Sequence, residues 1–263
     1  MDKILQVKNL NKTFTSNSFS LFSAPKAVVA ANNITFDINR GESFGLVGES
    51  GSGKSTIANI IARLLPPDSG QILFNGQNIF KSKGKEARNY YRNLQMVFQD
   101  PYATLNPRKT IGWSIGEALR NFGDISREEV KQRVVEALTD VGLNSSYYDR
   151  YPHNLSGGQR QRVAIASTII LRPELILIDE GVSALDVSIQ AAILNLLNDL
   201  KKKYKLTYLF ISHDLNVIEY FCDRVAVMYR GDLIEVFDPS VTSVEDRSDY
   251  TRKLFDSIPQ IYL

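Results

Sequence analysis

The sequence contains very little cysteine and histidine. Its single cysteine, Cys222, excludes an internal disulfide and any cysteine-built cluster or zinc site within the chain. Two histidines, His153 and His213, are too few for a histidine-rich metal site. We therefore expect no metal site within the chain that is built from cysteine or histidine.

Long apolar runs and a strong excess of either charge are also missing. The longest apolar stretches, VAIASTIIL and ELILI, fall well short of the roughly 20 residues that a membrane-spanning helix requires. The N-terminus, MDKILQVKNLNKTF, has no apolar region followed by a small-residue cleavage site, so we expect the chain to stay in the cytoplasm. The 31 basic and 29 acidic residues nearly cancel, which argues against nucleic acid as a partner. We interpret the run KKKYK at 201–205 as the solvated end of a helix.

What the sequence does contain predicts a folded α/β protein. At 263 residues, 43% of them hydrophobic, the chain can bury a sizeable core. Residues 4–10, 27–38 and 43–48 mix β-branched and aromatic residues between turn-forming clusters and predict strands. After residue 54 the apolar positions follow helical spacing up to the stop PPDSG; they are Ile57, Ile60, Ile61, Leu64 and Leu65.

The rest of the chain first becomes helical and then returns to strands. From about Arg92 to Ile169 the pattern is mainly helical, and it includes a capping box at Ser126–Glu129 that opens an amphipathic segment. Strand signals return in ELILID, TYLFIS and RVAVMY, with helices between them, so we predict a largely parallel sheet. A hairpin around Gly231 and a short helix, DYTRKLFDSI, complete the pattern. We predict one domain, with a core at 1–91 and 170–235, an inserted helical subdomain at 92–169 and a short tail at 236–263.

The stretch GESGSGKST predicts a phosphate-binding loop, because it fits G-x-x-x-x-G-K-[ST] between a predicted strand and a predicted helix. Glycines in such a loop let backbone N–H groups turn inward around phosphate oxygens, a concavity that a Cβ would obstruct. One helix N-terminus contributes only about 0.3–1 kcal/mol towards an anion, so Lys54 on the β- and γ-phosphates and Mg²⁺ held by Ser55 must supply much of the attraction. The alternative is an ordinary glycine-rich turn with an exposed lysine. The predicted ATP-binding loop is Gly48, Glu49, Ser50, Gly51, Ser52, Gly53, Lys54, Ser55 and Thr56.

Two acidic residues and a histidine follow predicted buried strands. LILI delivers Asp179 and Glu180 to the carboxyl edge of the sheet, where α/β proteins bind ligands. We expect Asp179 to hold Mg²⁺, directly or through water, and Glu180 to orient and polarise the attacking water. His213 follows TYLFIS, and we predict a γ-phosphate contact for it; the alternative is that it caps the next helix.

A second glycine-rich helix start occurs in SGGQRQRVAIAS. Ser156 and Gln159 form another capping box, and Gly157 and Gly158 expose the backbone donors of a helix N-terminus. This pattern is typical of an anion site, and it is also compatible with a helix that is simply well capped.

The whole set of motifs resembles the ATP-binding subunits of ABC (ATP-binding cassette) transporters across nearly all of the chain. LSGGQ matches the family's signature, and the order phosphate loop, Gln99, signature, acidic pair, SALD and His213 matches throughout. The resemblance implies an α/β fold: a P-loop NTPase (RecA-like) core with a largely parallel sheet, an antiparallel N-terminal β part and an inserted α-helical subdomain. It also implies that two chains pair head to tail, each closing its signature over the ATP held by the other.

Further positions are assigned by this resemblance. Gln99, in MVFQD, matches the glutamine that senses Mg²⁺ and water and links the site to the membrane subunits. SALD, ending at Asp186, matches the loop that crosses the dimer interface. Phe14 is the best match to the aromatic residue that stacks on adenine, with Phe19 and Phe22 as rivals. Gly181 departs from the proline or alanine that usually follows the catalytic glutamate, and we expect it to alter the rate at most.

Three stretches resemble the oligopeptide, dipeptide and nickel importer branch and its F-type subunit: MVFQDPYATLNPRKTI, YPHNLSGGQRQRVAIA and YTRKLFDSIP. The resemblance implies an ATPase on the cytoplasmic face of the membrane, with ATP and Mg²⁺ as cofactors. Its partners are a second, different ATPase subunit, two transmembrane permease subunits and an extracytoplasmic solute-binding protein. The cargo stays open between peptides and nickel or a metal chelate. Two other functions also stay open: a soluble cassette ATPase acting on nucleic acid or ribosomes, and a regulatory nucleotide-binding module without turnover.

Overall fold

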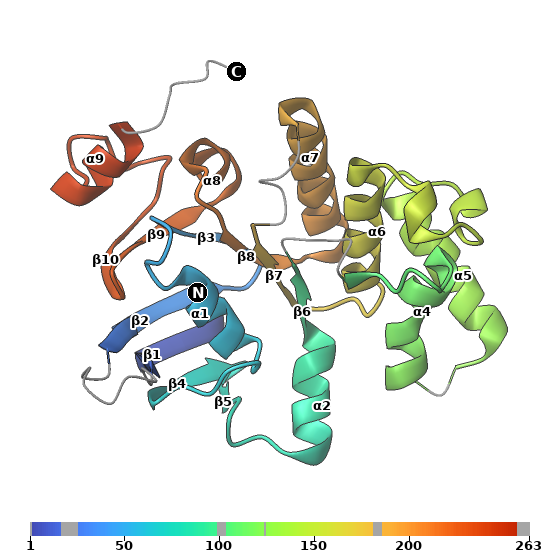
Figure 1. The fold of residues 1–263 in the computed structure, drawn as a ribbon, viewed down its shortest axis with the longest axis horizontal. Helices are drawn as coiled ribbons and strands as arrows, with labels where there is room; N and C mark the ends of the chain where they lie inside the picture. The colour runs from blue at the N-terminus through green and yellow to red at the C-terminus, as the bar shows by residue number, and fades with distance from the viewer. Residues whose placement is uncertain (1, 17–25, 99–103, 124, 181–185, 257–263) are drawn as a thin grey trace. The chain divides into compact units, whose positions relative to one another are not determined.

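The computed structural model describes residues 2–16, 26–98, 104–123, 125–180 and 186–256, and the chain divides into two compact units (Figure 1). Unit 1 consists of Met1–Ala87 and Leu209–Leu263, and unit 2 is Arg88–Tyr208. The chain passes between the units within α2 (Gly84–Asn93) and within β8 (Thr207–Ile211). Among the helices in these ranges, none combines the length and the apolar character needed to cross a bilayer.

Unit 1 contains an antiparallel sheet built mainly from the start of the chain. Its strands, in spatial order, are β2 (Lys26–Asn39), β1 (Lys3–Ser16), β4 (Ser69–Phe74) and β5 (Gln77–Asn78). Every neighbouring pair is antiparallel, and the apolar side chains of β1 and β2 are buried at Leu5, Val7 and Ile34. This confirms the predicted antiparallel N-terminal part.

A second group of strands in unit 1 supplies parallel pairing. They are β3 (Ser43–Gly48), β9 (Arg224–Tyr229) and β10 (Asp232–Phe237). β3 and β9 run parallel, from Phe44 opposite Arg224 to Gly48 opposite Met228. β10 returns antiparallel to β9 through the predicted hairpin at Gly231. All six residues of β3 are buried, as expected for a parallel strand covered on both faces.

The first helix of unit 1 is shorter than the sequence predicts. The helices of this unit that follow its strands are α1 (Lys54–Ile61), α8 (Leu215–Phe221) and α9 (Asp249–Asp256). Ile57, Ile60 and Ile61 are buried as expected, but Arg63 takes a left-handed conformation (φ 58°) and Leu64 is 62% exposed. The prediction that the buried face reaches Leu65 is wrong, because the chain leaves the helix before the proline pair.

Unit 2 contains a strand that the sequence analysis missed. β6 (Leu94–Val97) lies inside the segment predicted to be mainly helical, and it pairs in parallel with β7 (Leu175–Asp179). Four residues are too few to display the two-residue period of a strand, so only the pairing with β7 reveals β6. The predicted parallel character of the sheet is confirmed by this pair and by β3 and β9.

The helical part of unit 2 follows the predicted pattern. Its longer helices are α4 (Ile111–Phe122), α5 (Arg127–Asp140), α6 (Gly157–Ile169) and α7 (Val187–Tyr204), with short 3₁₀ turns η1 (Ser145–Tyr147) and η2 (Pro152–Asn154). α4, α5 and α6 pack on one another. Ser126 caps α5 by accepting from the backbone N–H of Glu129 (3.1 Å), whereas the Glu129 carboxylate pairs with Arg133 (2.6 Å). The lysine run ends α7, as predicted.

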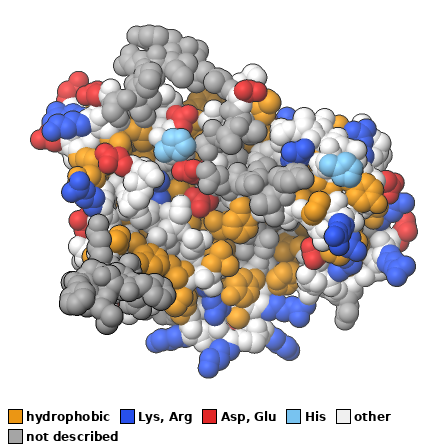
Figure 2. All heavy atoms as spheres, viewed as in Figure 1, with side chains coloured by type: hydrophobic (Ala, Val, Ile, Leu, Met, Phe, Trp, Pro, Cys, Tyr) orange, Lys and Arg blue, Asp and Glu red, His pale blue; other side chains and the backbone are white. Residues whose placement is uncertain are grey.

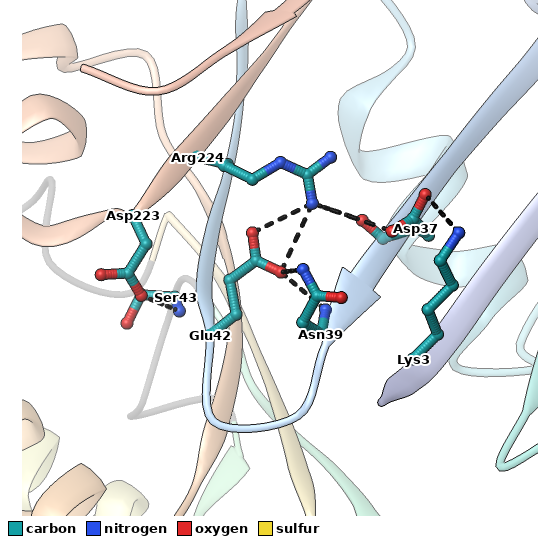
Figure 3. A network of polar contacts seen from close by, with 7 residues as sticks. All are labelled: Lys3, Asp37, Asn39, Glu42, Ser43, Asp223 and Arg224. Atoms are coloured by element: carbon teal, nitrogen blue, oxygen red, sulfur yellow. Dashed lines mark hydrogen bonds and ion pairs between the residues drawn. The ribbon is translucent and has the colours of Figure 1, made fainter. Parts of the chain in front are cut away.

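A polar network ties together the starts of β3 and β9 in unit 1 (Figure 3). The buried Glu42 carboxylate accepts from the backbone N–H of Asn39 (2.6 Å), from its side-chain amide (2.9 Å) and from Arg224 Nη1 (3.2 Å). The other members are Lys3, Asp37, Ser43 and Asp223. Because Arg224 is held opposite Phe44, the network supports the register that places Gly48 against Met228 at the far ends of the two strands.

Replacing Glu42 by glutamine tests this network. Glu42→Gln leaves Arg224 without its buried carboxylate, so we expect the free energy of unfolding to fall by about 1–3 kcal/mol. Urea denaturation monitored by fluorescence measures the change, with Glu245→Gln at an exposed position as the control. Equal unfolding midpoints for the two variants would contradict the assignment.

Candidate functional site

The predicted phosphate loop, residues 48–56, lies between β3 and α1 in unit 1, as expected. The N-cap of α1 is Gly53, which offers no side-chain hydrogen bond, and the first turn carries no acidic residue. The first-turn N–H groups of a helix have no intrahelical partner, and the dipole places partial positive charge there. α1 therefore begins in the way that anion-binding helices do.

Two glycines of the loop are required by the approach of neighbouring backbone. A Cβ built on Gly48 (φ 150°) would lie under 3.0 Å from the carbonyl oxygen of Met228 on β9. A Cβ built on Gly53 (φ 109°) would lie equally close to the carbonyl oxygen of Ala30 on β2. The sequence analysis assigned these glycines to the inward turn of N–H groups. The structure adds a second reason, because two strands press against the loop from outside it.

Lys54 is held inside its own loop. Its ammonium group donates to the carbonyl oxygens of Gly48 (2.8 Å) and Glu49 (2.9 Å) and to Ser52 Oγ (3.4 Å). The residue is only 5% exposed, so these bonds offset the cost of burying a charge. The alternative interpretation expected an exposed lysine, and the burial of Lys54 contradicts that expectation. Ser55 next to it is exposed.

His213 also belongs to unit 1 and lies just after β8. It is exposed, and helix α8 is capped instead by Asp214, whose Oδ1 accepts from the backbone N–H groups of Asn216 (3.1 Å) and Val217 (3.4 Å). The alternative role of His213 as a helix cap is therefore wrong. Its predicted contact with a γ-phosphate stays a prediction.

Phe14 lies on β1 in unit 1, opposite Val28 of β2. Its side chain is 42% exposed, and Lys12 Nζ lies 5.7 Å from the centre of its ring. An exposed aromatic face of this kind can stack on a base. Phe19 and Phe22, the rivals for this role, lie outside the described residues.

In unit 2, the predicted second helix start is α6, and its capping box is complete. Ser156 Oγ accepts from the backbone N–H of Gln159 (3.4 Å), and the Gln159 side-chain oxygen accepts from the backbone N–H of Ser156 (3.0 Å). The amide nitrogen of Gln159 donates to the hydroxyl of Tyr147 (3.0 Å). A Cβ on Gly158 would approach Ile189 of α7 to 2.9 Å. Tyr147 was missed by the sequence analysis, because no local pattern relates η1 to α6.

The acidic pair lies at the end of β7 in unit 2. The four residues before it, from Leu175 to Ile178, are buried, and Asp179 and Glu180 are half-buried. Glu180 has a left-handed backbone (φ 49°), which is uncommon for a residue other than glycine and clusters at functional positions. Asp186 begins α7 without a side-chain capping hydrogen bond.

Other predicted site residues fall outside the described residues. They are Gln99, Gly181 and the first three residues of SALD, 183–185. The phosphate loop, Phe14 and His213 belong to unit 1, and the acidic pair, Asp186 and α6 belong to unit 2.

The oxygen donors at these positions fit a magnesium ion. A serine hydroxyl and an aspartate carboxylate are the hard ligands that Mg²⁺ prefers, and Mg²⁺ commonly takes one or two protein ligands together with phosphate oxygens and water. Ser55 and Asp179 are donors of this kind. Within the ranges that the structure describes, no group of three or more His, Cys, Asp or Glu residues could hold a metal. Ser55 lies in unit 1 and Asp179 in unit 2, and each by itself is an oxygen donor of the kind that Mg²⁺ takes beside phosphate oxygens.

Comparisons with known sequences agree with these features. Residues 31–183 match the family model described as ABC transporter. The chain is 44% identical over 265 residues to the oligopeptide transport ATP-binding protein OppF of Bacillus subtilis (strain 168), covering 98% of this chain and 83% of that protein. It is 44% identical over 258 residues to the glutathione import ATP-binding protein GsiA of Pectobacterium atrosepticum, covering 98% of this chain and 41% of that protein.

Comparisons with solved structures confirm the predicted fold class. A dimeric, post-hydrolysis structure of the ATP-binding cassette MJ0796, bound to ADP and Pi, has a TM-score of 0.78 and 30% identity, covering 89% of this chain and 98% of that one. CbiO1 from Clostridium perfringens, described as part of the ABC transporter complex cbiONQ, has a TM-score of 0.79 and 30% identity, covering 99% of this chain and 97% of that one.

Replacing Gly53 by alanine tests the packing of the phosphate loop. The new Cβ meets the Ala30 carbonyl at a left-handed backbone position, so we expect Gly53→Ala to lower the free energy of unfolding by about 1–3 kcal/mol. We also expect at least about tenfold weaker binding of a fluorescent ATP analogue, because one hydrogen-bond loss is worth up to about 1.5 kcal/mol and the loop presents several donors. Gly123→Ala, at an extended position with ordinary contacts, is the control and should change neither measurement. Wild-type nucleotide affinity in Gly53→Ala would refute the packing argument.

Proposed function

Because the chain belongs to the ABC transporter family, we propose that it is the ATP-hydrolysing subunit of an importer, in which ATP binding and hydrolysis drive solute uptake. The observation that carries this proposal is the phosphate loop, where Lys54 is buried against loop carbonyls at the start of a helix with no side-chain cap. A loop of this geometry offers backbone donors and one ammonium group to a triphosphate.

We propose that the working form is a head-to-tail pair with a second ATPase subunit. The glycine-led start of α6 in unit 2 would face the ATP that the partner subunit binds, and Asp186 would lie at the same interface. The complete capping box supports this assignment, because it holds the helix end in one conformation and its two hydrogen bonds use neither the Gly157 nor the Gly158 N–H group. The dimeric state described for the MJ0796 cassette is a precedent for such pairing.

In the proposed hydrolysis, Glu180 orients the attacking water and takes up its proton, and His213 contacts the γ-phosphate. Gln99 senses the water and the metal ion. Bound at Ser55 and Asp179, Mg²⁺ would neutralise the charge on the β- and γ-phosphates. ATP binding favours the closed pair and hydrolysis the open pair, so the difference in stability between these states drives the permeases.

We propose that two permease subunits anchor the chain at the cytoplasmic face of the membrane and that a solute-binding protein delivers the cargo. A groove of about 380 Å³ in unit 2 supports a permease contact. It is lined by residues of β6, α4 and α6 and includes Phe98, the residue before Gln99, and Trp113. A permease segment in this groove would contact Phe98, which precedes in the sequence the glutamine predicted to sense the nucleotide.

Among the cargoes left open, we propose a peptide. The names of the relatives support it, since OppF is described for oligopeptide transport and GsiA for glutathione import. No specific observation favours nickel or a metal chelate, or either of the alternative functions. Exposed lysines at 81 and 83 precede α2, and exposed Lys85 lies in its first turn. Figure 2 shows basic side chains gathered over this end of the helix, but the net charge of the chain is only +2.

We also propose the functional division of the chain predicted from the sequence. Residues 1–91 and 170–235 would form the nucleotide-binding core, 92–169 the helical signature subdomain and 236–263 a short tail. The mutual packing of α4, α5 and α6 supports the helical subdomain.

Replacing Glu180 by glutamine tests the catalytic assignment. Glu180→Gln retains the shape of the side chain but removes the base, so we expect kcat for ATP hydrolysis to fall by about 10²–10⁴-fold while ATP binding persists. Phosphate release by the assembled complex gives the rate, and Glu245→Gln is the exposed control. Undiminished hydrolysis in Glu180→Gln would remove Glu180 from the mechanism.

Alanine variants of two N-cap serines distinguish a role of Ser156 in subunit pairing from a role in helix stability alone. Ser156→Ala and Ser126→Ala each remove an N-cap hydroxyl that accepts from the N–H three residues on, at a cost of about 0.5–2 kcal/mol. We expect only Ser156→Ala to weaken ATP-dependent pairing, by at least about tenfold (about 1.4 kcal/mol). Sedimentation with ATP in a Glu180→Gln background measures the pairing. Equal weakening by both alanines would mean that α6 contributes stability alone.

A further inference from the structure

Helix α9 of the tail reaches the neighbourhood of the phosphate loop through Tyr250. The ring of Tyr250 packs on the ring of Tyr229, with centroids 4.5 Å apart and planes tilted by 46°. Tyr229 is the last residue of β9 and follows Met228, the residue whose carbonyl presses against Gly48. The contact of α9 is therefore made on the strand that shapes the loop.

The hydroxyl of Tyr250 is buried beside this loop. Within the part of the chain that the structure describes, it has no hydrogen-bond partner. Glu49, the second residue of the loop, lies close to it: burial and then the negative charge of Glu49 raise the pKa of Tyr250. The hydroxyl is thus protonated at neutral pH and can donate. A buried donor next to an exposed carboxylate has an obvious acceptor once the loop moves slightly.

The backbone carbonyl of Glu49 accepts hydrogen bonds from two groups of the phosphate loop. Its carbonyl oxygen accepts from Lys54 Nζ (2.9 Å) and from the backbone N–H of Ser52 (3.1 Å). A displacement of Glu49 therefore moves an acceptor of the ammonium group that is predicted to bind the β- and γ-phosphates. The sequence pattern identifies Glu49 only as the second residue of the phosphate loop. Its neighbour Tyr250 on α9 is about two hundred residues away, so no local pattern relates the two.

The helix that carries Tyr250 is firmly attached. The Ser248 hydroxyl donates to the Glu235 carboxylate on β10 (2.9 Å), and the Ser248 backbone N–H donates to the same group (3.0 Å). Arg247 is buried between the rings of Phe237 and Phe255, and it pairs with Glu219 of α8 (2.6 Å). Because contacts with β10 and with α8 hold the start of α9 in place, the position of Tyr250 beside the loop is fixed.

From this geometry we propose that Tyr250 is a positioning residue for nucleotide binding. Its hydroxyl hydrogen-bonds Glu49 in the nucleotide-bound form and holds the Glu49 carbonyl, and with it Lys54, in the arrangement that grips the triphosphate. The inference rests on the proposed ATP-binding function and adds the C-terminal helix to the nucleotide site.

The decisive variant is Tyr250→Phe, which retains the ring packed on Tyr229 and removes only the hydroxyl. In the assembled complex, we expect the Kd for ATP and the KM to rise about 3–10-fold with kcat unchanged, the range expected for one lost hydrogen bond. Tyr220→Phe, on the 64% exposed tyrosine of α8, is the matched control and should leave both constants unchanged. A thermal midpoint equal to wild type for Tyr250→Phe confirms that folding is intact.

A double-mutant cycle with Glu49→Ala shows whether Tyr250 acts through Glu49. If it does, Tyr250→Phe changes the Kd only when Glu49 is present. Equal Kd values for wild type and Tyr250→Phe, or the same loss in both backgrounds, would overturn the inference. Failure of the proposed function gives a different result, because the wild-type complex would then bind no ATP at all.

Discussion

The backbone carbonyl groups that surround the phosphate loop are the constraint on which the rest of unit 1 depends. The carbonyl of Ala30 comes from the antiparallel sheet and that of Met228 from the parallel strands, and both occupy the space that a side chain would need at Gly53 and Gly48. The loop therefore takes its shape from two sheets that meet around it. The position of the Met228 carbonyl beside Gly48 depends on the register of β3 and β9. The network around Glu42 supports this register at the opposite end of β3.

Lys54 shows how the fixed backbone of the loop suits the predicted binding of phosphate. An ammonium group can be buried only when acceptors surround it, and the loop supplies two carbonyl oxygens and a hydroxyl. The acceptors are neutral, so a doubly or triply charged phosphate competes with them effectively. The charge is thus placed in advance, and little reorganisation is needed when a nucleotide binds. Tyr250 extends this arrangement outward to the C-terminal helix.

The two glycine-led helix starts differ in a way that suits different tasks. α1 begins at Gly53 without a side-chain cap, as expected for a helix start that a phosphate group approaches. α6 begins with a complete capping box, and the amide nitrogen of Gln159 also donates to the hydroxyl of Tyr147, so the helix end is held in one conformation. In the proposed head-to-tail pair, a helix end that is already ordered would suit the partner's nucleotide, because ordering it on contact would reduce the binding free energy.

The sequence by itself determined the features that neighbouring residues encode: the phosphate loop, the capping box at Ser156, the strands that precede the acidic pair and the family. These depend on spacing within a few residues, because backbone hydrogen bonding and side-chain period are local. It did not determine the end of α1, the strand β6, the true partners of Gly48 and Gly53, or the contacts of Tyr147 and Tyr250. The end of α1 depends on the left-handed turn at Arg63, which apolar spacing does not reveal. Only the tertiary structure decided the others, because each is a contact between residues separated in the chain, and one sequence does not specify which distant atoms meet.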